Sequence, residues 1–404
     1  GEIARVVRDH GAQISLGSID LAQWHLAIMR SGAGARRRAA WLDYDSGGKH
    51  GHYDAMNLGL YAFGLDLLPD MGYPPIQFMT KDGGPASFWY HSAAAHNTVV
   101  VDGENPRGRP NYEFVDRPTD IVAGRMTLWL DSGHFRGMRV AGAGFYPQAR
   151  QYERTVLMID LSDADFYMVD IFRVIGGREH VRFTHSHFAN ISTAGLALRP
   201  AEPYGRETIM RDFQSDPAPA IPWSADWRIE DYYHLLPSGP DAHLRLTDFT
   251  LGAEACLCQA WVVAGLYNSR DEKWIPRVMV RRRAGAGETL ATTFVSVLEP
   301  YRGQRLVKAI RRLALESPRG CPYSQAHVAL EIEHNDGTKD LIVAADAENP
   351  LMGRPSLATD GELIQPEWKV RLAGELIFVR RDSAGRVTDC VSGKTSRSNL
   401  VCGI

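Results

Sequence analysis

The sequence lacks an excess of charge of either sign, since 45 Lys and Arg residues stand against 48 Asp and Glu residues in a chain of 404. A formal net charge of −3 provides no basic field over the whole protein, and we therefore expect no nucleic-acid partner. No run approaches the roughly 18 apolar residues of a membrane-spanning helix, and no apolar segment follows a basic start. Neither a membrane partner nor a signal peptide is predicted.

Cysteine is also scarce. An odd number of residues in a long chain does not describe a disulfide framework, and the five are Cys256, Cys258, Cys321, Cys390 and Cys402. One residue separates Cys256 from Cys258, which is too few for a zinc ribbon, so we interpret both as small buried side chains. Cys390 and Cys402 flank a polar tail and are able to pair if the protein is exported.

What the sequence does contain is a strong tendency to form strands. Residues 1–42 carry apolar spacings of three and four, which predict helix. From Tyr44 onward, short β-branched and aromatic runs are separated by Gly, Pro, Asp and Asn. Strands are predicted near residues 97–103, 155–160, 166–174, 181–188, 256–263, 292–298, 328–332, 340–344 and 375–379.

These patterns predict a mainly β fold. No repeat of about 20–50 residues is visible, which argues against a propeller or a solenoid. So many strands without helices alternating between them favour stacked antiparallel sheets. We therefore expect a multi-sheet β-supersandwich with a short N-terminal helical segment at one edge.

The first candidate site residues are His50, His52 and Asp54. If their segment is extended, all three project from one face, because strand side chains repeat every two residues. Asp70 follows His52 by 70 − 52 = 18 residues, which leaves room for a strand, a turn at Phe63-Gly64 and a return strand. A β-hairpin would therefore bring the Asp70 carboxylate beside the histidines.

A further histidine, His96, stands at the entry of the β-forming run at 97–103. Two imidazoles and one carboxylate with an open position are a ligand set that zinc accepts. The grouped histidines and carboxylates therefore offer such a set, without deciding which of them are the ligands.

Four blocks in this order resemble the C-terminal part of the heparinase II/III-like polysaccharide lyases, which have alginate lyases among their relatives: HGHYD (50–54), LYAFG (60–64), LLPDMGY (67–73) and SAAAHNTVVVDG (92–103). The resemblance covers residues 41–103 and returns in TFVSVLEP (293–300). Members join an N-terminal α/α toroid to a multi-sheet β-sandwich. The resemblance implies a toroid remnant in 1–42, the β-supersandwich in 43–310 and a C-terminal β-rich region in 311–404.

The resemblance also implies roles for individual side chains. His50 becomes the catalytic general base. The ligands of a zinc or other divalent ion become His52, Asp70 and His96. Asp54 becomes a carboxylate that accepts a hydrogen bond from a ligating or catalytic imidazole without touching the ion. The residues placed at the substrate are Asn97, which would otherwise cap a turn, and the aromatic side chains Tyr53, Trp89 and Tyr90.

The implied activity is cleavage of a uronic-acid-containing anionic polysaccharide by β-elimination, with a glycosaminoglycan such as heparan sulfate, hyaluronan or chondroitin as substrate. His50 would remove the C5 proton, and a tyrosine of the toroid would protonate the leaving oxygen. The implied location is periplasmic or secreted, and a homodimer is compatible with the pattern. An alginate lyase of the same architecture is the alternative substrate assignment.

One departure from the family pattern is that only 49 residues precede His50, too few for a toroid. We therefore expect the toroid in a removed segment of the same precursor or in another chain, or a truncated member. Two other interpretations stay open. One is a non-catalytic glycan-binding or partner-docking sandwich with a structural metal, and the other is a metallo-hydrolase with an HxHxDH motif, although position 55 is Ala.

Overall fold

The computed structural model describes residues 2–11, 16–49, 51–78, 84–111, 120–205, 208–236, 241–265, 268–317, 325–346, 363–372 and 374–393. Within these ranges the chain is mainly β, and its largest sheet has eight strands. In spatial order they are β10 (Arg125–Ser132), β11 (Phe135–Ala141), β12 (Ala149–Asp160), β13 (Phe166–Gly176), β22 (Ala291–Arg302), β19 (Ala242–Asp248), β18 (Trp223–Ile229) and β15 (Ala189–Ala194). We call this the central sheet.

A six-stranded sheet packs on one face of the central sheet. Its order is β16 (Arg199–Pro200), β17 (Met210–Asp216), β20 (Glu254–Ala264), β21 (Asp271–Arg283), β14 (Glu179–His185) and β7 (Val99–Val101). The N-terminal sheet consists of β1 (Ile19–Leu21), β2 (Leu26–Ser31), β3 (Arg38–Asp43), β5 (Asn57–Ala62) and β6 (Leu65–Asp66). A small sheet joins β8 (Pro110–Asn111), β4 (Asp45–Lys49) and β9 (Ile121–Ala123).

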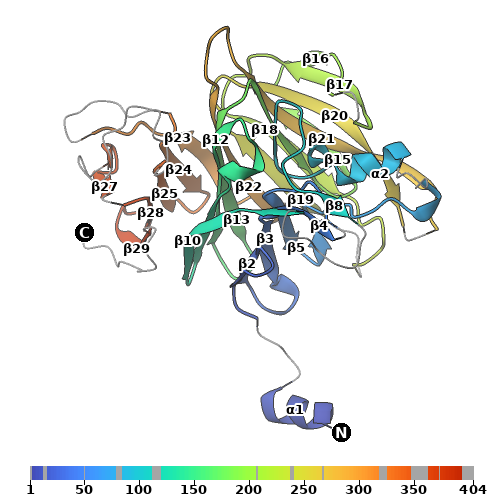
Figure 1. The fold of residues 1–404 in the computed structure, drawn as a ribbon. Helices are drawn as coiled ribbons and strands as arrows, with labels where there is room; N and C mark the ends of the chain where they lie inside the picture. Colours follow the sequence, from blue (N-terminus) through green and yellow to red (C-terminus); the bar gives the residue numbers. More distant parts are fainter. Residues whose placement is uncertain are drawn as a thin grey trace.

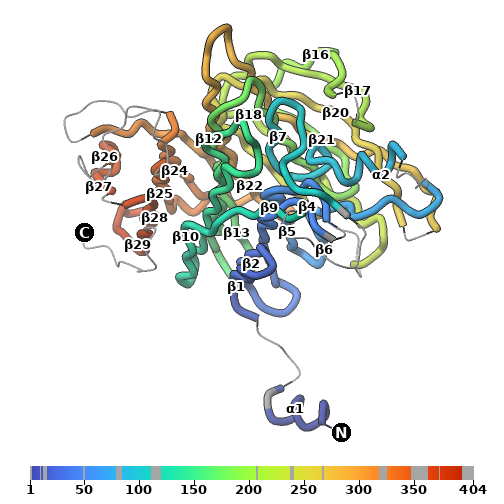
Figure 2. Tube along the Cα trace, viewed as in Figure 1, coloured from blue at the N-terminus to red at the C-terminus, as the bar shows by residue number. Residues whose placement is uncertain are grey.

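The C-terminal sheet covers the other face of the central sheet, and Figures 1 and 2 show its strands, in orange to red, on the side away from α2. It contains β23 (Val307–Arg312), β24 (Val328–His334), β25 (Lys339–Ala344), β28 (Leu376–Arg381) and β29 (Val387–Gly393), and β26 (Leu363–Gln365) pairs with β27 (Val370–Leu372) beside it. The described helices are α1 (Glu2–His10), α2 (Gly84–His91) and the 3-10 turns η1 (Gly34–Arg36), η2 (Ile76–Phe78), η3 (Ala93–Ala95) and η4 (Ala143–Phe145).

Alternating side chains explain how one sheet serves two cores. On β12, Val156 belongs to the core shared with the N-terminal and six-stranded sheets, whereas its neighbour Leu157 belongs to the core shared with the C-terminal sheet. Both side chains are fully buried. A strand with two buried faces reads as a continuous apolar run, because neither face needs polar residues. The expected supersandwich of more than two stacked sheets is confirmed.

The helical expectation for residues 1–42 is correct only for α1 and wrong beyond it. Residues 2–9 are exposed, and α1 lies apart from the sheets (Figure 1). In β3, burial follows a period of two: Arg38, Ala40 and Leu42 are buried, while Ala39 and Trp41, which alternate with them, are only partly covered. Pairing with β5 creates this pattern, which a stripe of apolar residues taken alone does not reveal.

The other predictions about the chain have mixed outcomes. All nine predicted strand regions contain observed strands. The implied boundaries after residues 42 and 310 cut β3 and β23, so neither separates independent sheets. Cys256 and Cys258 are buried as expected, and burial raises the pKa of both thiols to about 12. No helix in the described ranges combines the length and apolarity needed to cross a membrane.

Candidate metal centre

The hairpin predicted before Asp70 is present. β5 and β6 pair antiparallel with Tyr61 opposite Asp66, and the two residues that join the strands are Phe63 and Gly64. Both have positive φ values, 60° and 86°, as a tight two-residue hairpin turn requires. The chain then passes through buried Leu67, Leu68 and Pro69 to Asp70. This local geometry carries the Asp70 carboxylate back toward the loop after β4.

His52 lies on a turn and not on the extended segment that we predicted. β4 ends at Lys49, and the Gly47 amide donates to the His52 carbonyl over 2.8 Å, so the chain folds back on itself. A Cβ on Gly51 would lie 1.9 Å from the Gly47 carbonyl oxygen, so the turn requires glycine at position 51. His50 lies outside the described residues, and its predicted place beside His52 on one strand face is not described.

His96 is held by the short turn that follows α2. Its backbone amide donates to Ala93, and its Nδ1 lies 2.8 Å from the Ser92 carbonyl oxygen. Because a carbonyl only accepts, this contact places the proton of the neutral ring on Nδ1 and leaves the lone pair of Nε2 free. The Arg277 guanidinium, 1% exposed, donates to the His96 carbonyl over 2.9 Å and ties the turn to β21.

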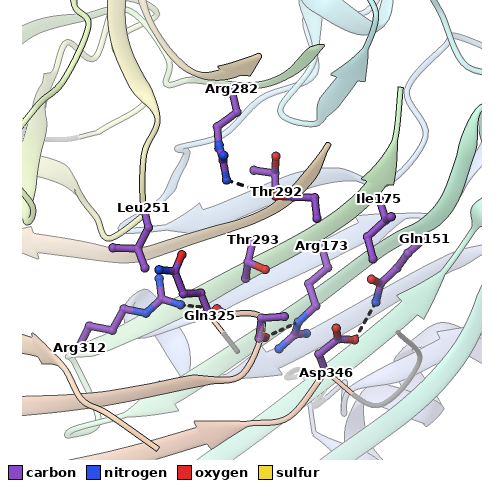
Figure 3. A pocket seen from close by; sticks show the side chains of 12 residues that line it. Gln151, Arg173, Ile175, Leu251, Arg282, Thr292, Thr293, Arg312, Gln325 and Asp346 are labelled. Atoms are coloured by element: carbon purple, nitrogen blue, oxygen red, sulfur yellow. Dashed lines mark hydrogen bonds between the residues drawn. The ribbon is translucent and has the colours of Figure 1, made fainter. Parts of the chain in front are cut away.

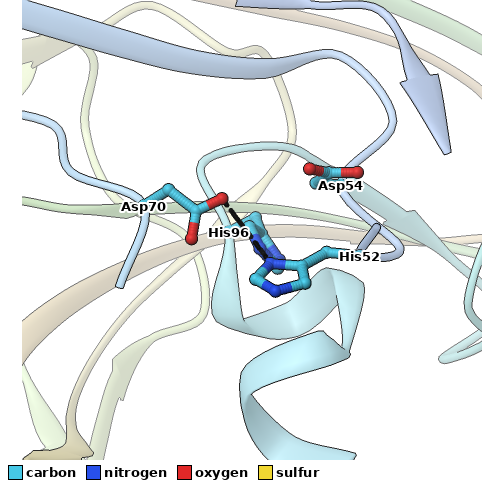
Figure 4. Close-up of side chains that lie close together, drawn as sticks. All are labelled: His52, Asp54, Asp70 and His96. Carbon is cyan, nitrogen blue, oxygen red and sulfur yellow. Dashed lines mark hydrogen bonds and ion pairs between the residues drawn. The ribbon is translucent and has the colours of Figure 1, made fainter. Parts of the chain in front are cut away.

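Three ligand atoms converge in the structure, as Figure 4 shows. His52 Nδ1 lies 3.0 Å from His96 Nε2 and 3.6 Å from an Asp70 carboxylate oxygen, which lies 3.4 Å from His96 Nε2. Ligand atoms around a tetrahedral zinc, at bond lengths of about 2.0–2.2 Å, lie about 3.3–3.6 Å apart. Two of the three observed separations lie in this range and the third, 3.0 Å between the two ring nitrogens, is shorter, so the residues need only a small adjustment to hold a zinc-sized ion.

Asp54 adds a fourth ligand atom, since the four side chains offer atoms that all lie within 4.8 Å of one another. Sequence reasoning placed this acid behind the ligands, but the structure puts it beside them. It is partly buried, and burial together with the carboxylates of Asp43 and Asp70 raises its pKa well above the ordinary value. Several carboxylates in one buried place repel each other, and a bound cation offsets that repulsion.

The electrostatics of Asp70 differ from those of Asp54. Burial acts to raise the pKa of Asp70, but the adjacent imidazoles of His96 and His52 hold it well below its ordinary value. Its side chain is 34% exposed, whereas those of His52 and His96 are 6% and 2% exposed. Asp70 is therefore an anionic candidate ligand at the more exposed side of the group, whereas both imidazoles are buried.

Two aromatic residues beside the ligands were not among the predicted site residues. Tyr73, 37% exposed, meets the His52 ring edge-on at 4.9 Å between centroids. His91 meets the same ring at 4.9 Å, and its Nδ1 lies 2.6 Å from the Ser87 carbonyl oxygen. Tyr73 is the last residue of the block LLPDMGY, three residues after Asp70. This closeness in sequence was the signal that could have predicted its place at the site.

Two aromatic residues that we predicted at the substrate, Trp89 and Tyr90, are buried instead. Trp89 and Tyr90 are 2% and 4% exposed, because α2 packs against the six-stranded sheet. The Trp89 indole donates to the Trp261 carbonyl, and the Tyr90 hydroxyl accepts from the Val263 amide. These contacts make both rings part of the core, so their assignment to the substrate is wrong.

Asn97 is also part of the scaffold, since it is 1% exposed. Its side-chain oxygen accepts from the His185 amide at 2.8 Å, and its own amide donates to Asn57 at 2.9 Å. A direct contact with substrate is therefore excluded for Asn97. Tyr53 is partly buried beside the same core, with its amide bonded to the His91 carbonyl.

Comparison with known proteins agrees with this architecture. Residues 15–194 match the family model described as heparinase II/III-like, C-terminal. This match confirms the resemblance that the four sequence blocks indicated. No curated protein matches the sequence.

Solved structures share the fold. The heparan sulfate lyase HepC from Pedobacter heparinus superposes with a TM-score of 0.54 at 16% identity, over 87% of this chain and 45% of its own. The heparinase III BT4657 gene product gives a TM-score of 0.55 at 15% identity, over 83% of this chain and 44% of its own. This chain thus spans less than half the length of either relative.

Proposed function

We propose that this chain forms the C-terminal β-sandwich of a polysaccharide lyase that cleaves a uronate-containing anionic polysaccharide by β-elimination. The observation that carries the proposal is the convergence of His52, Asp70 and His96 to within 3.0–3.6 Å, inside a fold shared with heparan sulfate lyase and heparinase III. The glycosaminoglycans named above are the proposed substrates, and alginate is the alternative that a substrate panel distinguishes.

The proposed reaction needs a base near the C5 proton of the uronate, which is weakly acidic until its carboxylate is neutralised. His50 is the proposed base, because an imidazole titrates near neutral pH and this residue directly follows β4, two positions before His52. The acid that protonates the leaving oxygen is assigned to a tyrosine of the toroid.

The proposed cofactor is a zinc ion held by His52, Asp70 and His96, with Asp54 as the fourth side chain within reach. When bound, the ion supplies a crosslink between the loop after β4, the segment after β6 and the turn after α2. The protein's own groups prepare this site: Ser92 orients the His96 ring, and the Gly47–His52 bond holds the loop.

The partner that would complete the site is the toroid. Apolar side chains on the elements α2 and η2 are uncovered in this chain, with Phe88 at 62% exposure and Ile76 at 57%. Exposed apolar groups rimmed by polar residues mark interaction surfaces. Cys390 is disulfide-bonded, which supports the proposed periplasmic or secreted location.

The experiment that tests the function is an ultraviolet assay of the complete natural protein. Each elimination creates a 4,5-unsaturated uronate that absorbs, so heparan sulfate, hyaluronan, chondroitin and alginate are offered in turn. An increase with one polymer supports the lyase proposal and identifies the substrate. A flat trace with every polymer contradicts it and favours a glycan-binding role.

We predict about one zinc ion per chain and a loss of thermal stability when it is removed by a chelator. Zinc at 100 times its dissociation constant stabilises the folded state by about 2.7 kcal/mol, since the ion binds the folded chain. Elemental analysis and melting curves with and without chelator measure both effects.

The matched control for this prediction is His243→Ala. His243 bonds to Asp226 on the central sheet, which carries none of the candidate ligands. This variant should retain its zinc, whereas His96→Ala should lose it. Equal metal content in the two variants would contradict the assigned ligands.

A further inference from the structure

A cavity of about 320 Å³, lined by both charged and apolar side chains, lies between the central sheet and the C-terminal sheet. Figure 3 shows side chains that reach it from both sheets and from β21. Among them are three arginines, Arg173 on β13, Arg282 on β21 and Arg312 on β23. Arg282 is the middle residue of the basic cluster at 281–283, whose neighbours pair with Glu254 and Glu179.

This cavity is separate from the candidate metal centre because the central sheet stands between them. On β12, Gln151 faces the cavity and donates to Asp346 over 2.9 Å. Arg154, three residues on, faces the opposite side, where its guanidinium donates to the Met56 and Asn97 carbonyls beside the metal ligands. Strand alternation thus assigns the two sites to opposite faces of one sheet.

The two ends of the cavity differ in charge. At one end Arg173 is 1% exposed and pairs with Glu153 at 3.0 Å, and the Asp346 carboxylate lies nearby (Figure 3). At the other end stand Arg282 and Arg312. Across the described part of the chain, neither of these two guanidinium groups forms an ion pair with a carboxylate.

The donors of this second end are only partly used. Arg312 donates to the Phe249 carbonyl at 2.9 Å and to the Gln325 carbonyl at 2.6 Å. Arg282 donates to the Ala291 carbonyl at 3.2 Å, while its buried Nε has no hydrogen-bond partner. Burial, with repulsion from Arg173, lowers the pKa of Arg312 to about 10, although the charge of Asp248 acts in the opposite direction. A partly buried guanidinium group with an unused donor favours an added anion.

We propose that the end of the cavity lined by Arg282 and Arg312 is an oxyanion site that takes the carboxylate or sulfate group of an acidic sugar. Arginine suits both groups, because its planar donors match two oxygens at once. The polar side chains of Thr293 and Gln325 line the same cavity and add donors. The sugar assignment rests on the proposed function, whereas the oxyanion site does not. Such a site would hold a polysaccharide at a second point, away from the reacting unit.

The test is calorimetric titration of the natural protein with sodium sulfate, glucuronate and uncharged glucose, in a buffer free of other oxyanions. We expect sulfate and glucuronate to bind and glucose not to bind. Arg282→Gln and Arg312→Gln should each weaken binding at least tenfold, since each removes charge-assisted hydrogen bonds. Binding should also weaken as sodium chloride is raised.

Arg283→Gln is the matched control, because this neighbour is 58% exposed and pairs with Glu179 outside the cavity. It should bind both anions as the wild type does, and so should His52→Ala, which keeps this test independent of the lyase assay. Melting curves establish that Arg282→Gln is folded. No binding of either anion, or unchanged binding in both cavity variants, would overturn the oxyanion site. Binding of sulfate without glucuronate would overturn the acidic-sugar assignment.

Discussion

Replacing His50 with alanine is expected to lower turnover on the polysaccharide substrate by about 100-fold to 10,000-fold while the melting temperature stays close to that of the wild type. The size of the effect is that of general-base catalysis by a positioned imidazole. The variant removes none of the candidate metal ligands, because these are His52, Asp54, Asp70 and His96. Initial rates of unsaturated-uronate formation and a thermal melt measure the two quantities on the same sample.

His52→Ala provides the contrast, because it deletes a ligand whose Nδ1 lies 3.0 Å from His96 Nε2. It should lower turnover and also lower the melting temperature, since metal binding energy is coupled to folding. Added zinc should restore neither the turnover nor the melting temperature of this variant. If the two variants lose stability equally, the division between a catalytic and a ligating histidine is wrong.

The second large effect concerns stability. Arg154→Leu should lower the free energy of unfolding by about 3–5 kcal/mol, because it leaves a buried carboxylate without its main partner. Arg154 is 2% exposed and binds both oxygens of Asp170, at 2.9 and 2.8 Å. The same guanidinium donates to the Met56 and Asn97 carbonyls at 2.6 Å, so the change also loosens the segments that carry Asp54 and His96. Chemical denaturation and zinc affinity measure the two consequences.

Two further variants separate the mechanism from a general loss of packing. Arg154→Leu combined with Asp170→Leu should recover much of the loss, since no charge is then left buried and unpaired. Arg283→Gln removes an exposed pair with Glu179 and should cost less than about 1 kcal/mol. A double variant as unstable as the single one would show that the buried charge is not the cause.

The hairpin and the ligand set could be predicted because their determinants are close together in the chain. A two-residue turn at Phe63-Gly64 sets the pairing of β5 with β6, and both residues adopt the positive φ that such a turn needs. The order of the four sequence blocks then placed His52, Asp70 and His96 in one group. The turn around Gly51 was missed, because the close approach of the Gly47 carbonyl depends on where β4 ends.

Several wrong predictions arise from contacts with distant parts of the chain. Trp89 and Tyr90 look like exposed sugar-binding aromatics in the sequence, but both bond to the β20 segment around Trp261, more than 170 residues away. Residues 19–43 have the composition of a helix stripe, but pairing between β3 and β5 makes them strands. Burial of this kind comes from long-range packing, which local periodicity does not encode.

By itself, the sequence determined the mainly β architecture, the strand positions and the identity of the convergent histidines and aspartate, because alternation and turn chemistry act over a few residues. Only the tertiary structure decided that Asp54 lies within reach of the candidate ligands, that the rings of Tyr73 and His91 contact that of His52, and that Arg282 and Arg312 line one cavity from different sheets. The physical reason is that a side chain's neighbours across stacked sheets depend on the register and packing of strands far apart in the chain.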